Sequence, residues 1–281
     1  MTREALTAST DALRAAGIEQ PRLDAELLLA EATGRDRAHL ASHPEAEIPP
    51  PAARRFGELV RRRLRREPVA YILGRRGFRH LELAVDPRVL IPRPETEMLV
   101  ELAVELQPAS LLDLGTGSGA IALAVADELP ACAVTATDTS AAALEVARTN
   151  AKRLGLADRV RFLEGSLPVG EGFDLILANL PYVAEADWAS LQPEVTKWEP
   201  REALLAGPDG LDAFRWLLSD RVRLFSSYGR KRAKSADRTI ALEVGEGQAE
   251  QVGAMLHEAG FDEVEVRADL AGIERVVIGR R

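Results

Sequence analysis

Cysteine is almost absent from this chain, since Cys132 is the only one among 281 residues. A single thiol excludes an internal disulfide bond and a metal site built from several cysteines, and we expect no metal. The chain also lacks any run near the roughly 20 apolar residues that a membrane helix needs. Its first residues lack the basic and then apolar pattern of a secretory signal peptide. We therefore expect a cytoplasmic protein that is not bound to a membrane.

Basic residues are scarce in the larger part of the chain. Residues 1–84 carry 15 Arg, no Lys and 12 acidic residues, a net charge of +3. The whole chain has a net charge of −8, so the remainder carries −11. An acidic remainder argues against direct binding to duplex DNA, which needs Lys and Arg to neutralise phosphates. One basic run, residues 54–66, contains seven Arg and one Glu. It is typical of a solvated helix face, and the alternative is a contact with a partner that is itself bound to RNA.

The first part of the chain has the spacing of a helical domain. A length of 281 residues exceeds one average domain, and a hydrophobic content of 46% can supply a sizeable core. Apolar residues recur at helical spacing in the segment 23–32, which Gly34 can end, and again after a group of prolines, at 52–66. We interpret residues 1–67 as a small helical domain.

Residues 68–93 follow a different pattern, in which apolar residues are grouped before and after the turn Asp86-Pro87-Arg88. This pattern predicts β structure between Val69 and Ile91 in the form of a β-hairpin. We interpret the segment as a connector that leads into a second domain at residues 94–281.

From residue 94 onward, predicted helices and strands alternate, which is typical of an α/β sheet that is parallel and covered on both faces. The expected strands are 110–114, 133–137, 160–163, 173–178 and 239–244, and the expected helices are about 95–106, 118–128, 140–154, 210–222 and 247–259. Two last strands, near 263–268 and 273–279, are joined by only a few residues. They must therefore pair antiparallel.

A glycine-rich segment follows the first of these strands and opens a helix. Gly115, Gly117 and Gly119 let the backbone turn tightly and approach a ligand closely. Asp138 ends the second strand, where a carboxylate can accept hydrogen bonds from both hydroxyls of a ribose. The two features together predict a nucleotide-like cofactor.

Two cofactors compete for this site. A nicotinamide dinucleotide needs its pyrophosphate at a helix N-terminus, and its usual glycine spacing differs from the one found here. S-adenosylmethionine instead carries a positive sulfonium and an amino group, which favour a nearby acid such as Asp113. We expect S-adenosylmethionine, with segment 164–167 beside the adenine; in the alternative reading Asp113 is a strand-end carboxylate satisfied by the protein. The expected cofactor residues are Asp113, Gly115, Thr116, Gly117, Ser118, Gly119, Asp138, Leu167 and Asn179.

The segment Asn179-Leu180-Pro181-Tyr182, here called the Asn-Tyr corner, ends the apolar strand at 173–178. Ligands of open α/β sheets bind at the carboxyl ends of strands. The corner places one amide side chain, two carbonyl groups and one aromatic ring there. That set can hold an NH2 group by acceptors while a flat group packs on the ring, and we expect these four residues to bind substrate.

These motifs resemble the protein glutamine N5-methyltransferases that act on class 1 peptide chain release factors, the HemK/PrmC family. The resemblance extends over most of the chain. It is carried by residues 22–29, 67–74, 89–97, 113–124, 179–182 and 199–211.

The resemblance implies a seven-stranded, Rossmann-like S-adenosylmethionine-dependent methyltransferase domain after an N-terminal helical domain that helps to grip the release factor. It implies methylation of the glutamine in the factor's Gly-Gly-Gln loop, in support of translation termination, with S-adenosylhomocysteine as the product. Arg93 and Glu95 are possible substrate contacts, although capping of a helix N-terminus explains the acid equally well. We expect a monomer.

Three positions depart from the family pattern. Leu180 stands where the family usually has Pro, which also makes the corner similar to the Asn-Leu-Pro-Tyr of ribosomal-RNA adenine dimethyltransferases. Leu167 stands where some members have an aromatic residue, so that only apolar contact with adenine is expected there. Residues 226–238 form a polar, basic stretch in place of a Pro-Gly-Gly turn. We expect a mobile loop there, with a partner contact as the alternative.

Three other functions stay open at this point. An adenine N6-methyltransferase of ribosomal RNA would use the same corner on an exocyclic amine, after the base had been unstacked. A related branch of the family methylates a glutamine of a ribosomal protein. A non-catalytic module would use the fold only to bind a partner.

Overall fold

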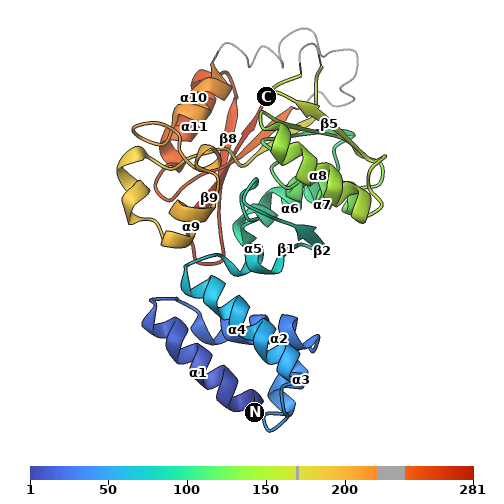
Figure 1. Ribbon diagram of the computed structural model, residues 1–281. Helices are drawn as coiled ribbons and strands as arrows, with labels where there is room; N and C mark the ends of the chain where they lie inside the picture. The colour runs from blue at the N-terminus through green and yellow to red at the C-terminus, as the bar shows by residue number, and fades with distance from the viewer. Residues whose placement is uncertain (169–170, 220–237) are drawn as a thin grey trace. The chain divides into compact units, whose positions relative to one another are not determined.

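The computed structural model describes residues 1–168, 171–219 and 238–281. Most of the predicted loop 226–238 therefore lies outside the described residues. The chain divides into two units (Figure 1). The helical unit consists of Met1–Arg75 with Gln192–Trp198, and the sheet unit consists of Arg76–Leu191 with Glu199–Arg281. The predicted domain boundaries at residues 67 and 93 stay predictions.

The helical unit contains six helices: α1 (Thr2–Ala15), α2 (Pro21–Thr33), α3 (Arg37–Ser42), α4 (Pro50–Leu64), α5 (Val69–Leu73) and α9 (Pro193–Trp198). Local signals explain their ends. Pro21 starts α2, and Gly34 ends it in the left-handed conformation at φ 66°, as the sequence predicts. Leucines that are fully buried or nearly so, among them Leu13, Leu28 and Leu59, form the core of this unit.

Helix α9 reaches the helical unit from a distant part of the chain, and Glu194 anchors it there. Glu194 accepts hydrogen bonds from Arg63 at 2.7 Å and from Arg66 at 2.6 Å. Arg63 is only 6% exposed and also donates to Asp24 at 2.7 Å. Burial would raise the pKa of Glu194, but the bonds from the two arginines outweigh it and hold that pKa below its usual value. Glu194 thus stays ionised in the core.

The basic run at 54–66 is therefore only partly a solvated helix face. Arg63 and Arg66 are structural, and Arg62 pairs with Glu67. Four other arginines of the run remain exposed: Arg54, Arg55, Arg61 and Arg65.

The predicted connector is partly wrong. Val69–Leu73 is helix α5 rather than a strand, because Pro68 starts a helical turn, Tyr71 and Ile72 are buried, and Gly74 ends it at φ 71°. The hairpin turns at Arg79-His80 rather than at the predicted Asp86-Pro87-Arg88, and its strands are β1 (Arg75–Phe78) and β2 (Leu81–Ala84).

Residues 89–91 are also not a strand. The backbone N–H of Ile91 donates to the Glu199 carboxylate at 3.1 Å. The Glu199 side chain thus accepts the hydrogen bond that a backbone carbonyl of a neighbouring strand would accept in a sheet.

The sheet unit is built on a seven-stranded sheet in the order β5-β4-β3-β6-β7-β9-β8. The first five of these pair in parallel, and β9 is antiparallel to both of its neighbours, as predicted for the last two strands. The strands are β3 (Ser110–Leu114), β4 (Ala133–Asp138), β5 (Val160–Glu164), β6 (Leu175–Ala178), β7 (Thr239–Glu243), β8 (Glu263–Ala268) and β9 (Glu274–Arg280).

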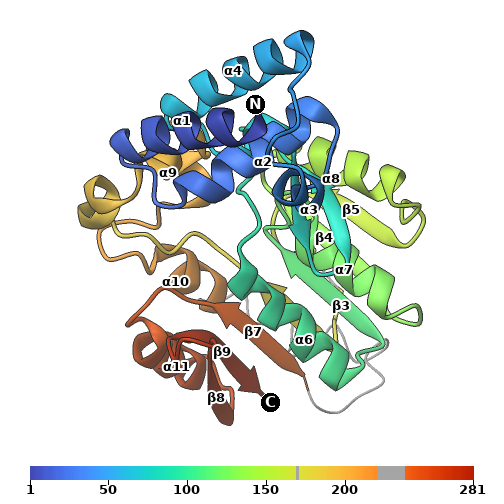
Figure 2. The ribbon, with the colours of Figure 1, turned by 90° about the horizontal axis from the view of Figure 1, so that it is seen from below.

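Helices cover both faces of this sheet, because successive strand residues point to opposite sides. The helices are α6 (Glu97–Leu106), α7 (Ala120–Glu128), α8 (Ala141–Arg153), α10 (Asp212–Leu218) and α11 (Ala249–Glu258), with 3₁₀ turns η1 (Pro94–Thr96), η2 (Glu185–Ser190) and η3 (Arg201–Ala203). Leu111 and Leu177 pack with α6 and α7 on one face. Leu112 and Ile176 pack with α10 and α11 on the other. Figures 1 and 2 show these helices on the two sides of the sheet.

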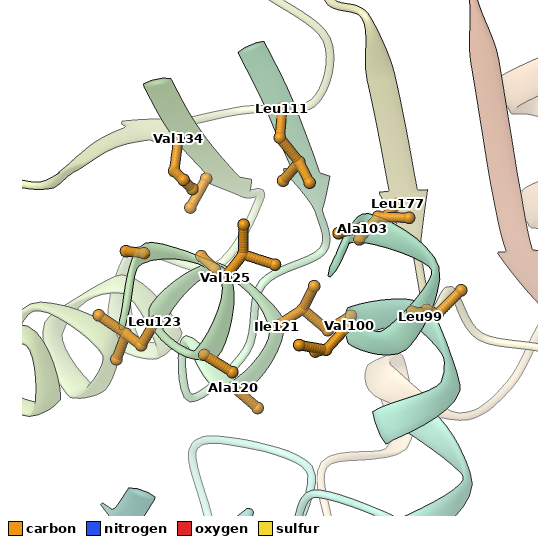
Figure 3. Packing of buried hydrophobic residues seen from close by; sticks show 14 of the residues in the cluster. Leu99, Val100, Ala103, Leu111, Ala120, Ile121, Leu123, Val125, Val134 and Leu177 are labelled. Carbon is orange, nitrogen blue, oxygen red and sulfur yellow. The ribbon is translucent and has the colours of Figure 1, made fainter. Parts of the chain in front are cut away.

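The first of these cores is closely packed. Figure 3 shows Val100 and Ala103 of α6 gathered with Ile121 and Val125 of α7 next to Leu111 of β3. Packing of this kind holds the strand ends in fixed positions. Across the described residues, none of the helices is long and apolar enough to cross a membrane.

We predict that Glu194→Ala lowers the free energy of unfolding by about 3 kcal/mol, because it leaves Arg63 with one buried partner fewer. Urea unfolding followed by circular dichroism measures this loss. Glu45→Ala is the matched control, since Glu45 pairs with Arg3 while both side chains are more than 60% exposed. The control should lose less than about 1 kcal/mol, and equal losses in the two variants would contradict the anchoring role of Glu194.

Candidate active site

The register of the parallel strands brings the candidate residues together. Leu114, Ala178 and Leu242 are paired neighbours on β3, β6 and β7. The residue that follows each of them therefore lies at the carboxyl edge of the sheet, and these residues are Gly115, Asn179 and Glu243. A pocket of about 410 Å³ opens at this edge and is lined by Gly115, Gly117, Asp138, Ser166, Asn179 and Pro181 among others.

The glycine-rich segment forms the floor of this pocket. The N–H groups of Gly115 and Thr116 both donate to the Thr137 carbonyl at 2.9 Å, which ties the turn to β4. Gly115 has φ 76°, and a Cβ there would lie 3.3 Å from Leu180 Cδ2, so this position favours glycine. Leu180, which stands where the family usually has Pro, is buried and lies against this glycine.

Asp138 is placed as the sequence predicts, at the end of β4 and on the pocket wall. One of its carboxylate oxygens accepts from the N–H of Gly117 and the other from the N–H of Ser140, both at 2.9 Å. A carboxylate has about four acceptor sites, so two remain for the hydroxyls of a ligand. The backbone bonds hold the group in place for that task.

Asp113 lies behind the glycine-rich segment rather than on the pocket wall. It is fully buried, and its Oδ2 accepts from the Thr116 hydroxyl at 2.6 Å and from the Ala122 N–H at 3.0 Å. Burial raises the pKa of Asp113 to about 7, although these hydrogen bonds oppose the rise. Thr116 and Ser118 are buried as well. The contacts of Asp113 therefore support the turn. They agree with the alternative interpretation of the sequence, in which Asp113 is a strand-end carboxylate satisfied by the protein.

The Asn-Tyr corner is held on both sides. The Asn179 side chain lines the pocket and donates from Nδ2 to the hydroxyl of the buried Thr96 at 3.0 Å. The carbonyl of Tyr182 accepts from Gln248 Nε2 at 3.0 Å. Burial, followed by the nearby Glu243 carboxylate, raises the pKa of Tyr182 to about 12, so its phenol stays neutral.

Eight predicted site residues lie off the pocket wall: Asp113, Thr116, Ser118, Gly119, Tyr182, Arg93, Glu95 and Leu167. Arg93 donates to Glu199 at 2.6 Å, and the Glu199 side chain is only 2% exposed. Glu95 lies half-buried in the first turn of η1, and Leu167 packs with the core on the α10 side. Their predicted contacts with substrate or adenine stay predictions.

Several pocket residues were missed in the sequence, among them Val89, Leu90, Pro200, Ala203 and Trp216. They come from loops, from the turn η3 and from α10, and the spacing of apolar and polar residues there predicts no position at the pocket. Glu243 was missed although the rule that located Asp138, a polar residue at the end of a parallel strand, applies to it too. Across the described ranges, no group of three or more His, Cys, Asp or Glu is placed to hold a metal ion.

A sheet of this order, with a pocket between a glycine-rich turn and an Asn-x-Pro-Tyr corner, defines a Rossmann-like class I methyltransferase. Family comparisons agree with this class. Residues 4–74 match the model of the PrmC N-terminal domain, and residues 94–194 match that of the methyltransferase small domain.

Relatives identify the family. The release factor glutamine methyltransferase of Caulobacter vibrioides is 41% identical over 98% of this chain and 95% of its own length. That of Xylella fastidiosa is 44% identical, over 96% and 97%. The chain belongs to the family of release factor glutamine methyltransferases.

Among solved structures, the catalytic domain of hMettl16 in complex with the MAT2A 3′UTR hairpin 6 overlaps with a TM-score of 0.57. The overlap covers 70% of this chain and 74% of that chain at 15% identity. This likeness shows the shared fold alone.

We predict that Asp113→Asn flattens the pH dependence of stability between about pH 4 and pH 7. Because the folded-state pKa is raised from 3.8 to about 7, the carboxyl favours folding below pH 4 and loses this contribution as the pH rises through 7. The free energy of unfolding of the variant relative to wild type should rise by on the order of 1–4 kcal/mol over this window. Parallel pH profiles of urea unfolding for the two proteins would contradict this.

We also predict that Gly115→Ala destabilises more than Gly117→Ala. Both positions have positive φ, but only at Gly115 does a Cβ meet a side chain, that of Leu180; a Cβ at Gly117 meets nothing within 4 Å. The extra loss in melting experiments should be about 1 kcal/mol, and Leu180→Ala in the Gly115→Ala background should relieve that clash. Equal losses at the two glycines would count against the close packing of Leu180 on the turn.

Proposed function

We propose that this chain transfers a methyl group from S-adenosylmethionine to the side-chain amide nitrogen, N5, of a glutamine in class 1 peptide chain release factors. By its family resemblance, the glutamine is that of the Gly-Gly-Gln loop. The observation that carries the proposal is the Asn179 side chain, which lines the pocket with its Nδ2 already bonded to Thr96. Its oxygen is therefore the atom left to accept hydrogen bonds from an amide NH2.

The pocket suits S-adenosylmethionine. The left-handed glycines of the turn let its backbone come close to a ligand, and Asp138 keeps acceptor sites for two ribose hydroxyls. When bound, this cofactor supplies a methyl group on a sulfonium, and S-adenosylhomocysteine is the product. Asp138, Gly115, Gly117 and Asn179 are the residues that we assign to holding it.

A primary amide nitrogen is a poor nucleophile because its lone pair is delocalised into the carbonyl. A general base is one remedy; the part of the pocket wall that the structure describes includes no His or Lys, and its carboxylates are Asp138, which we assign to the cofactor, and Glu202. Positioning is the other remedy. Asn179 Oδ1 and the carbonyl of Leu180 or Pro181 can each accept one amide hydrogen, which fixes the nitrogen in line for transfer. Such positional control is worth roughly 7–11 kcal/mol at its best.

The same acceptors stabilise the positive charge that develops on nitrogen as the new N–C bond forms. One amide proton then passes to solvent, which restores the neutral N-methyl amide. Tyr182 is assigned to packing against the flat amide, and its neutral phenol suits that contact. Since the acceptors exist before substrate arrives, little reorganisation is needed in the reaction.

The partner is a protein rather than DNA, as the acidic charge of residues 85–281 also favours. We assign the grip on the release factor to the helical unit. The exposed arginines of α4 then suit a partner that is itself associated with RNA. A translation factor as substrate implies the cytoplasm as the site of action, and we propose that the enzyme acts as a monomer.

We predict that Asn179→Ala lowers kcat for methylation of a release factor by about 100- to 1,000-fold, as expected when one preorganised polar contact to the transition state is lost. The measurement is transfer of a labelled methyl group to purified release factor.

Calorimetric titration with S-adenosylmethionine supplies the control. Cofactor affinity retained alongside lost transfer supports a role in positioning the substrate. Transfer at nearly the wild-type rate would exclude the proposed mechanism.

A further inference from the structure

Three segments that are distant in sequence meet behind the Asn179 side chain. Asn179 follows β6, Glu243 ends the neighbouring strand β7, and Thr96 ends the turn η1. Thr96 is 4% exposed and Glu243 is 2% exposed, whereas Asn179 lines the pocket. The buried pair thus lies on the protein side of the residue that we assign to substrate binding.

The hydrogen bonds of this group have a direction. Although burial raises the pKa of Glu243, the Thr96 side chain lowers it as a hydrogen-bonding neighbour. Because an ionised carboxylate can only accept, we infer that the proton of the Thr96 hydroxyl points to Glu243. The Thr96 hydroxyl has only one proton, and it is then directed to Glu243. Its oxygen can only accept from Asn179, which is the observed bond from Nδ2 at 3.0 Å. None of the described residues makes a hydrogen bond to Asn179 Oδ1.

This direction decides which end of the Asn179 amide the substrate meets. With Nδ2 turned to Thr96, the oxygen faces the pocket as an acceptor. A reversed amide would offer N–H groups to the NH2 of the glutamine, and donor would face donor.

We propose that Thr96 and Glu243 are positioning residues, which orient the Asn179 side chain so that its oxygen accepts the amide hydrogens of the substrate. The inference rests on the proposed function and deepens it.

The cost of burying Glu243 supports a role in the site. Its Oε2 is buried and has no hydrogen-bond partner among the described residues. Burial raises the pKa of Glu243 to about 7, against the lowering effect of Thr96. An apolar side chain at the end of β7 would avoid this cost. A carboxylate at this buried position is explained if its role is to accept a hydrogen bond from the Thr96 hydroxyl.

The charges around Glu243 set the pH at which the direction can reverse. Glu95 on η1 raises the pKa of Glu243, whereas Arg275 on β9 and Arg93 before η1 lower it; the neutral Tyr182 also faces it. Above this pKa the carboxylate accepts from Thr96. Below it the protonated acid can donate to Thr96, which frees Thr96 to donate to Asn179 and lets the amide turn over. Transfer should therefore weaken as the pH falls through about 7.

The activity test compares Thr96→Val and Glu243→Gln with wild type. Both should lower kcat for methyl transfer at least tenfold while changing the affinity for S-adenosylmethionine less than twofold. Thr96→Ser, which keeps the hydroxyl, should restore most of the activity. Thr239→Val is the matched control, since Thr239 is also buried and lies at the opposite end of β7 from Glu243. This control should retain the wild-type kcat.

The pH profile separates positioning from a merely structural role. Wild type and Thr96→Ser should lose kcat below about pH 7, and Glu243→Gln should show no such inflection. If wild type methylates a release factor and Thr96→Val does so equally fast, the positioning role is wrong and the proposed function stands.

NMR tests the orientation of the Asn179 amide without an activity measurement. In NMR spectra, the side-chain NH2 of Asn179 should exchange slowly with water in wild type, shift as Glu243 titrates, and exchange fast in Thr96→Val. Equal exchange in the two proteins would overturn the inference whether or not the release factor is the substrate. Conversely, slow exchange together with no methylation of any release factor would leave the orientation intact and overturn the proposed function.

Discussion

The parallel register of β3, β6 and β7 is the constraint on which the candidate site depends. It aligns three buried residues, so that Gly115, Asn179 and Glu243 follow one another along a single edge of the sheet. A slip of one residue in any strand would turn the corresponding side chain to the other face of the sheet. The cores on both faces oppose such a slip, because the strand residues between them alternate between α6 and α7 on one side and α10 and α11 on the other.

Two carboxyls are buried near this edge of the sheet at a cost in free energy. Asp113 supports the glycine-rich turn; in both Asp113 and Glu243, burial raises the pKa to about 7, although the neighbouring Thr96 lowers that of Glu243. Neither has an ion-pair partner within hydrogen-bonding distance among the described residues. By contrast, Glu194 in the helical unit is ionised and held by two arginines. The sheet unit therefore contains two carboxyls whose pKa is close to neutral pH, next to the proposed site of chemistry. The helical unit instead uses an ionised carboxylate and two arginines for stability.

Long apolar runs and special glycines made most of the fold predictable from the sequence. The strand 110–114 and the end of α2 at Gly34 match the expected positions. Short apolar segments were less reliable, since five residues such as Val69–Leu73 fit a helix as well as a strand. Features that depend on distant contacts could not be predicted. The place of Glu194 in the helical unit and the bond from Asn179 to Thr96 join residues 83 or more positions apart.

The most direct test of the account is to locate the methyl group. Purified enzyme, a class 1 release factor and ribosomal RNA are incubated with methyl-labelled S-adenosylmethionine, and each product is digested and read by mass spectrometry. The account predicts one labelled methyl group on the side-chain nitrogen of the glutamine in the Gly-Gly-Gln loop, and none on RNA. Label on an adenine of the RNA, or on another residue of the release factor with that glutamine unmodified, would contradict it.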